Sequence, residues 1–191
     1  MKSIIKLALL FGLLAFIILP ALTILGEEKA GDKEKIAFVG ATKCKMCHNK
    51  KSSGLYFDDW SKSKHAEAFS LLKGDERSNP VCLKCHTTAF GEPGGFAKFV
   101  ENDETSLKMA NVQCEMCHGP GEKHIKSKKD AVVKHEWEPE EKTCLKCHVK
   151  EGNPNWKDDK YTTKDGKKVG FDFEQAVKII AHKVKKEGEE K

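Results

Sequence analysis

The stretch Cys44-Lys45-Met46-Cys47-His48 decides how this chain folds, because the sequence repeats its pattern three more times. Two thiols one helical turn apart, followed at once by a histidine, form the attachment signature of c-type haem. The thiols reach the vinyl groups on one edge of the porphyrin, and the histidine supplies an axial imidazole. The pattern therefore predicts four covalently bound haem c groups. The other copies are Cys82-Leu83-Lys84-Cys85-His86, Cys114-Glu115-Met116-Cys117-His118 and Cys144-Leu145-Lys146-Cys147-His148.

Two other kinds of site use similar cysteine pairs. A single C-x-x-C-H motif also occurs as a redox-active cysteine pair or as part of a zinc knuckle. Here all eight cysteines fall into the four motifs, and a histidine follows each one. Neither a zinc site nor a thiol redox site needs that repetition, so we interpret the motifs as haem attachment sites.

The spacing of the motifs predicts the fold class. They begin at residues 44, 82, 114 and 144, which leaves too little chain per haem for an ordinary side-chain core. We expect a mainly α, small multihaem cytochrome, with short helices and long loops wrapped around four packed c-type haems. Hydrophobic periodicity predicts helices near 55–73, 122–130, 139–149 and 171–187, and no stretch alternates as a strand would.

The first 26 residues are a targeting segment. Lys2 and Lys6 precede an uncharged run, LALLFGLLAFIIL, that Pro20 ends, as in a signal peptide. The apolar stretch up to Leu25 approaches the roughly 20 residues that span a bilayer, so a retained membrane anchor is the alternative. Both interpretations place the tetrahaem domain, residues 27–191, in the periplasm or another extracytoplasmic space.

The charge pattern bears on the choice of partners. The net charge is +5, with lysines scattered among acidic residues and Arg77 as the only arginine. No basic run is interleaved with aromatic residues, so nucleic acid is not an expected partner. The predicted partners are a redox donor and a redox acceptor, with membrane association through the N-terminal segment as a further prospect.

Four histidines lie outside the motifs, which would suit a second axial ligand at every haem iron. His65 shares a helical face with Ala68 and Phe69, a setting that suits a face lying on a haem. His124 follows the turn Gly119-Pro120-Gly121, at the expected start of a short helix. Both are predicted iron ligands.

The other two histidines are less defined by pattern. His182 lies in the predicted C-terminal helix, nearly opposite the apolar stripe that includes Phe173 and Val177, so periodicity alone does not decide its role. His135 lies in irregular sequence before the fourth motif. An iron ligand, a distal-pocket residue and a solvated histidine all remain open for it.

Beyond the haem motifs, the sequence resembles the cytochrome c-554 family of tetrahaem proteins. The resemblance covers most of residues 27–191 and rests on four stretches in order. They are W-x-x-S-x-H-A-x-A at 60–68, F-G-x-x-G-G-F at 90–96, N-V-x-C-E-x-C-H-G-P-G at 111–121 and F-D-F-E…A-H at 171–182.

This resemblance implies a crossed ligation pattern. His65 would ligate the fourth haem opposite His148, His124 the first opposite His48, and His182 the third opposite His118. The second haem, on His86, would be five-coordinate, with His135 the counterpart of a nearby distal histidine. This chain is shorter before the second and fourth motifs than the family pattern, and its count of spare histidines would also allow His135 to close the second haem.

The leading functional hypothesis is an electron-transfer protein that works between an extracytoplasmic oxidoreductase and a membrane quinone or cytochrome pool. A second hypothesis is an enzyme, in which an open second haem reduces a small nitrogen oxide such as nitric oxide and His135 donates the proton. A third is a subunit of a multihaem electron-conducting assembly. No catalytic residue is assigned beyond this role of His135.

Overall fold

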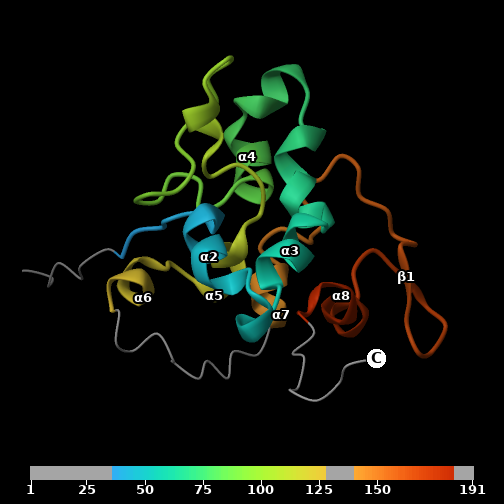
Figure 1. Ribbon diagram of the computed structural model, residues 1–191. Coiled ribbons are helices and arrows are strands. Elements are labelled where there is room, and N and C mark those ends of the chain that lie inside the picture. Colours follow the sequence, from blue (N-terminus) through green and yellow to red (C-terminus); the bar gives the residue numbers. More distant parts are fainter. Residues whose placement is uncertain (1–35, 128–139, 183–191) are drawn as a thin grey trace, which may run out of the picture. The chain divides into compact units, whose positions relative to one another are not determined.

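The computed structural model describes residues 36–127 and 140–182, which lie in one compact unit of the chain (Figure 1). Short helices joined by long loops make up this unit, so the prediction of a mainly α fold is confirmed; the packing of haems stays a prediction. The α-helices are α2 (Ala41–His48), α3 (Tyr56–Ser61), α4 (Pro80–His86), α5 (Cys114–His118), α6 (Glu122–Lys126), α7 (Glu141–Cys144) and α8 (Phe173–Ile180). The 3-10 helices are η1 (Lys51–Ser53), η2 (Lys64–Leu71), η3 (Gly74–Arg77) and η4 (Glu104–Leu107).

Every haem motif begins on a helix. Helices α2, α4 and α5 each carry a whole motif and end at its histidine. Helix α7 ends at Cys144, yet His148 N still donates to Cys144 O at 2.9 Å, so the fourth motif keeps a helical turn. Helix α4 shows why the chain is helical here: Asn79 Oδ1 caps it by accepting from Val81 N at 2.9 Å, and Pro80 fits its first turn.

The helix predicted over 55–73 is two helices in the structure. Helix α3 ends at Ser61, whose hydroxyl donates to Asp58 O at 2.8 Å, and Ser63 then adopts an extended conformation. Such serine bonds compete with the helical pattern of the backbone, which explains the break. The chain resumes as the 3-10 helix η2, which carries His65 and buries Ala68 and Phe69.

The other predicted helices are shorter than expected. Helix α6 covers 122–126 of the predicted 122–130, and α7 covers 141–144 of 139–149. Helix α8 covers 173–180 of 171–187, because Ala181 leaves the helical conformation. Residues 128–130, 139 and 183–187 of these predictions lie outside the described residues.

The expectation of no strand was wrong in one place. Strands β1 (Tyr161–Thr162) and β2 (Lys168–Val169) pair antiparallel, with Tyr161 opposite Val169. Two residues per strand are too few for an alternating pattern to show in the sequence. Turn bonds close the hairpin instead, with Thr163 N donating to Lys167 O at 2.9 Å.

The protein core is small and rich in phenyl rings. Phe96 is 1% exposed, and its ring centroid lies 5.5 Å from that of Phe69 and 6.5 Å from that of Phe90. The loop before Phe96 approaches Ala89 so closely that a side chain at Gly95 would collide with the Ala89 carbonyl. The rest of this cluster is formed by Leu72, Leu83, Met109 and Ala110.

A segment just before the third motif joins the core to two haem sites. Asn111 N donates to His86 O at 3.1 Å, and Val112 N donates to His65 O at 3.0 Å. Asn111 has the left-handed φ of 69°, and its Oδ1 accepts from Phe69 N at 2.8 Å. Trp60 Nε1 donates to Val112 O at 2.9 Å and holds α3 to the same segment.

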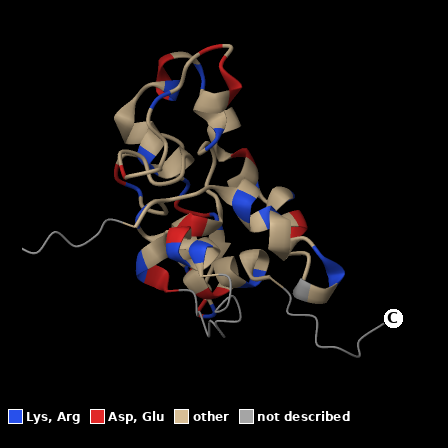
Figure 2. Ribbon diagram, turned by 60° about the vertical axis from the view of Figure 1, so that its left-hand side comes forward, with Lys and Arg blue, Asp and Glu red and all other residues tan. Residues whose placement is uncertain are grey.

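Charges of both signs cover the surface. Figure 2 shows Lys and Arg interspersed with Asp and Glu along the described chain. Surface ion pairs such as Lys62–Asp58 at 2.6 Å and Lys150–Asp158 at 2.8 Å join exposed side chains. None of the helices in the described part of the chain has the length and apolarity to cross a bilayer. The predicted targeting segment, residues 1–26, lies outside that part.

We expect Phe96→Ala to lower the free energy of unfolding by about 3–5 kcal/mol, because it leaves a cavity among the core phenyl rings. Denaturant unfolding of the haem-loaded protein measures this. Val100→Ala, at a side chain that is 37% exposed, is the control and should cost about 0.5 kcal/mol or less. Equal losses in the two variants would contradict a core at Phe96.

We expect Asn111→Ala to cost about 2–4 kcal/mol, because alanine is strained at this φ and leaves the Phe69 N–H without its acceptor. Asn111→Gly avoids the backbone strain but still lacks the hydrogen bond to Phe69 N, so it should lower the free energy of unfolding less than Asn111→Ala does. The same unfolding experiment compares the two variants. A glycine variant that is less stable than the alanine variant would show that the left-handed conformation is not the cause.

Candidate haem-binding site

The structure brings together three pairs of histidines, each made of one motif histidine and one histidine from elsewhere. The His48 and His124 ring centroids lie 6.2 Å apart, with planes inclined by 32°. Those of His65 and His148 lie 5.9 Å apart at 59°. Those of His118 and His182 lie 6.4 Å apart at 9°. These are the same three pairs that the resemblance implied.

These separations fit an iron atom between two imidazoles. A metal–nitrogen bond of about 2.0 Å on each side, plus about 1.15 Å from each nitrogen to its ring centre, puts the centroids about 6.3 Å apart. The observed range of 5.9–6.4 Å brackets that value. The donor set also fits, because each pair lies beside a C-x-x-C-H motif whose thiols would attach the same haem.

His86 is the one histidine in the described chain that stands outside these pairs. Its Nδ1 lies 2.5 Å from the Ala68 carbonyl oxygen, so the ring donates its Nδ1–H there. A histidine that ligates a metal usually donates its second nitrogen in this way, which fixes the tautomer and leaves Nε2 for the metal. His135, the remaining histidine of the sequence, lies outside the described residues.

In the described part of the chain, these histidines form pairs and no larger cluster. Within residues 36–127 and 140–182, no three His, Cys, Asp or Glu side chains come together as they do around a protein-bound metal ion. Two imidazoles that face each other can ligate one haem iron, since the porphyrin fills the four remaining positions.

Cysteines of different motifs lie next to one another. The Cys44 thiol hydrogen-bonds with that of Cys114, and the Cys147 thiol with that of Cys85. Burial raises the pKa of Cys117, and the nearby Cys144 raises it further. The first motif therefore adjoins the third, the third adjoins the fourth, and the fourth adjoins the second.

The surroundings of three of the paired histidines, His48, His65 and His148, favour the neutral imidazole. Burial lowers the pKa of His48, and the nearby His124 and His182 lower it further. Burial also lowers the pKa of His65 and of His148, with positive charges close by adding to the effect. A neutral imidazole keeps the lone pair that a metal needs, so the surroundings of these rings favour ligation.

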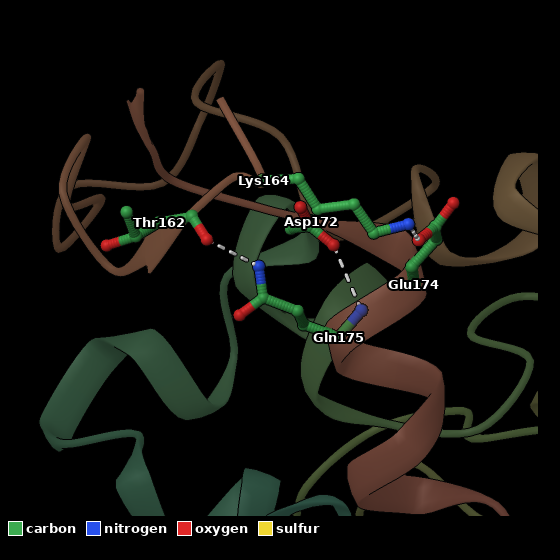
Figure 3. A network of polar contacts seen from close by, with 5 residues as sticks. All are labelled: Thr162, Lys164, Asp172, Glu174 and Gln175. Carbon is green, nitrogen blue, oxygen red and sulfur yellow. Dashed lines mark hydrogen bonds and ion pairs between the residues drawn. The ribbon is translucent and has the colours of Figure 1, made fainter. Parts of the chain in front are cut away.

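Polar contacts hold the C-terminal helix that leads to His182 (Figure 3). Asp172 Oδ1 caps α8 by accepting from Gln175 N at 2.9 Å. Gln175 Nε2 donates to the Thr162 carbonyl of β1, also at 2.9 Å, so the hairpin and the helix are joined. Because the helix ends at Ile180, His182 follows it in non-helical chain. Helical periodicity therefore could not place this histidine.

Two aromatic side chains that sequence motifs did not single out as site residues contact the histidine pairs. The Phe171 ring stacks on His148, with centroids 4.9 Å apart and planes inclined by 18°. The Tyr56 ring lies 6.1 Å from that of His48 and 5.2 Å from that of His182, so it touches two pairs. Phe171 belongs to the F-D-F-E stretch of the resemblance, which was the one signal for it. Tyr56 carried none.

Comparisons with known proteins show what this chain is similar to. The family model "Cytochrome c554 and c-prime" matches residues 43–119, which include the first three motifs. The chain is 28% identical over 193 residues to cytochrome c-554 of Nitrosomonas europaea, across 81% of this chain and 77% of the relative. No solved structure matches significantly. The predicted resemblance to the cytochrome c-554 family is therefore confirmed.

Proposed function

We propose that the chain is an exported four-haem electron carrier. It takes electrons one at a time from an oxidoreductase outside the cytoplasm and passes them towards a membrane quinone or cytochrome pool. The coarser part of this statement, a multihaem c-type electron-transfer protein with redox-protein partners, follows from the family. The number of haems, the ligands, the location and the direction of transfer are the proposal.

The observation that carries the proposal is the set of three histidine pairs. Each spare histidine of the described chain lies opposite a different motif histidine, at the spacing of two ligands on one iron. Two imidazoles from separate segments would hold both axial positions of a bound haem, so no small molecule would need to bind for the electron to move. Closed centres of this kind favour a relay over catalysis.

Haem c supplies one-electron redox chemistry when it is bound. The chain's own residues decide how well each centre is held. His48, His118 and His148 would anchor the proximal sides of three haems, and His124, His182 and His65 would complete them in the same order. His86 would hold the second haem through Nε2, because its Nδ1–H is donated to Ala68.

The adjacency of the motifs supports a continuous relay. The contacts Cys44–Cys114, Cys117–Cys144 and Cys85–Cys147 link the attachment points in the order first, third, fourth, second. A linear order gives the carrier two ends, one at the first motif and one at the second. We infer that donor and acceptor meet the protein at different ends.

A second candidate function is the reduction of a small nitrogen oxide at the second haem. The observation that favours it is the position of His86 outside the histidine pairs of the described chain. Under this hypothesis His135 would donate the proton. Carbon monoxide added to the fully reduced protein distinguishes the two functions. A changed spectrum indicates an open iron, and an unchanged spectrum leaves electron transfer as the remaining function.

The number and ligation of the haems are tested by two measurements on the purified protein. Intact mass should show four covalent haems, and electron paramagnetic resonance of the oxidised protein should show low-spin signals for at least three. A mass that fits fewer haems would overturn the four-haem proposal. A high-spin signal from one haem in four would assign the open iron to the second motif.

We expect His65→Ala, His124→Ala and His182→Ala each to convert one low-spin haem to a high-spin one, because each removes one axial nitrogen. The same resonance spectrum measures this, and intact mass checks that all haems are still attached. Lys123→Ala, at an exposed side chain beside His124, is the matched control and should leave the spectrum unchanged. Unchanged low-spin signals in all three histidine variants would contradict the proposed ligands.

A further inference from the structure

The carboxylate of Glu115 is buried between two haem-binding motifs. Glu115 is 3% exposed and lies on α5 between the two cysteines of the third motif. Its oxygens accept backbone N–H bonds from Val39 at 3.0 and 3.1 Å, from Gly40 at 2.8 Å and from Gly121 at 2.6 Å. One side chain therefore joins three chain segments.

The same contacts cap the helix of the first motif. Helix α2 has no capping side chain of its own at Gly40. Its first N–H groups bond to the third-motif segment instead, because Gly40 N donates to Glu115 and Ala41 N donates to Gln113 Oε1 at 2.6 Å. A carboxylate at this helix end also meets the positive end of the helix dipole. The residues on either side of Cys114 thus act as the N-cap of α2.

Gln113 is fixed in turn by its own bonds. It is 7% exposed, and its Nε2 donates to Lys108 O at 2.9 Å and to Ala110 O at 2.8 Å. With both residues fixed, α2 is held against α5, and the Cys44 and Cys114 thiols are in contact. The spacing of the first and third attachment points therefore depends on this cap.

Glu115 also brings a negative charge to that position. In the described part of the chain its partners are backbone N–H groups, and the ion pairs there use other carboxylates. Hydrogen bonding to Cys44 and burial raise the pKa of Cys114, and the charge of Glu115 raises it further. At Cys44 the hydrogen bond to Cys114 lowers the pKa, and the charge of Glu115 acts in the opposite direction. The charge acts on both attachment points.

We propose that Glu115 is a positioning residue that holds the first haem motif against the third and, through its buried negative charge, favours the oxidised state of the two haems attached there. This rests on the four-haem function proposed above. Each iron gains one electron on reduction, so its site loses one positive charge. A fixed negative charge in a low-dielectric interior stabilises the more positive, oxidised form.

The test is Glu115→Gln, which keeps the shape of the side chain and removes its charge. In a redox titration of the haem-loaded protein, followed by resonance of the individual low-spin haems, two of the four transitions should move to higher potential. At the wild-type midpoint potential, the ratio of reduced to oxidised haem should rise at least tenfold. This corresponds to a shift of 59 mV in the midpoint potential of a one-electron couple. The other two transitions should change less than twofold.

Glu122→Gln is the matched control. Glu122 accepts from Ala37 N at 2.9 Å, in the same segment that Glu115 holds, but it is ion-paired with Lys126 at 2.7 Å. The same change of charge there should alter the ratio of reduced to oxidised haem less than twofold at every transition. No shift in Glu115→Gln, an equal shift of all four transitions, or an equal effect of Glu122→Gln would overturn the proposal.

Glu115→Asp separates the tether from the charge. The shorter side chain keeps the charge but falls short of Val39 and Gly40. Amide exchange over residues 36–41 should then be at least tenfold faster than in the wild type, with all transitions within twofold of wild type. This variant tests the tether even if Glu115→Gln does not take up its haems, since unchanged exchange would overturn the tether. Fewer than four haems on the wild-type chain would instead count against the proposed function.

Discussion

Under the proposed ligation, the need for an axial ligand on each face of a haem is the constraint on which the rest of this structure depends. A C-x-x-C-H motif supplies one imidazole only, and its short helix cannot turn back to offer another. The second nitrogen would have to come from a different segment, and each paired histidine of the described chain lies far along the sequence from the motif histidine that it faces. His48 lies opposite His124, His65 opposite His148, and His118 opposite His182. The long loops are therefore the means by which the chain crosses from one motif to the partner of another.

Backbone hydrogen bonds from one short segment keep these crossings in register. Residues 111–115 contact His86 and His65 through Asn111 and Val112, and they cap α2 through Gln113 and Glu115. These contacts are hydrogen bonds, and the side-chain core of the described chain is one small cluster around Phe69 and Phe96. Buried polar groups that are fully bonded specify one arrangement more sharply than apolar packing does. In a chain with little core, that specification falls to this segment.

The sequence predicted the chemistry better than the local structure. The four motifs point to haem directly, and the resemblance supplied the histidine pairs that the structure brings together. Periodicity failed where local geometry decides: Ser61 and Ser63 break the helix predicted over 55–73, and α8 ends before His182. The contacts of Glu115 were also hidden, because its acceptor role depends on amides about 75 residues away. No pattern within the motif distinguishes it from a solvated glutamate.

The pair formed by His118 and His182 has a consequence for how the protein is made. Under the proposed export and ligation, the chain crosses the membrane from its N-terminus, so the third haem would wait for its second ligand until residue 182 has crossed. The first haem completes earlier, when His124 arrives. Assembly would thus finish at the third motif, whose segment also holds the first in place. A chain cut short before the end of α8 would keep every attachment site and still lack a closed centre in the middle of its relay.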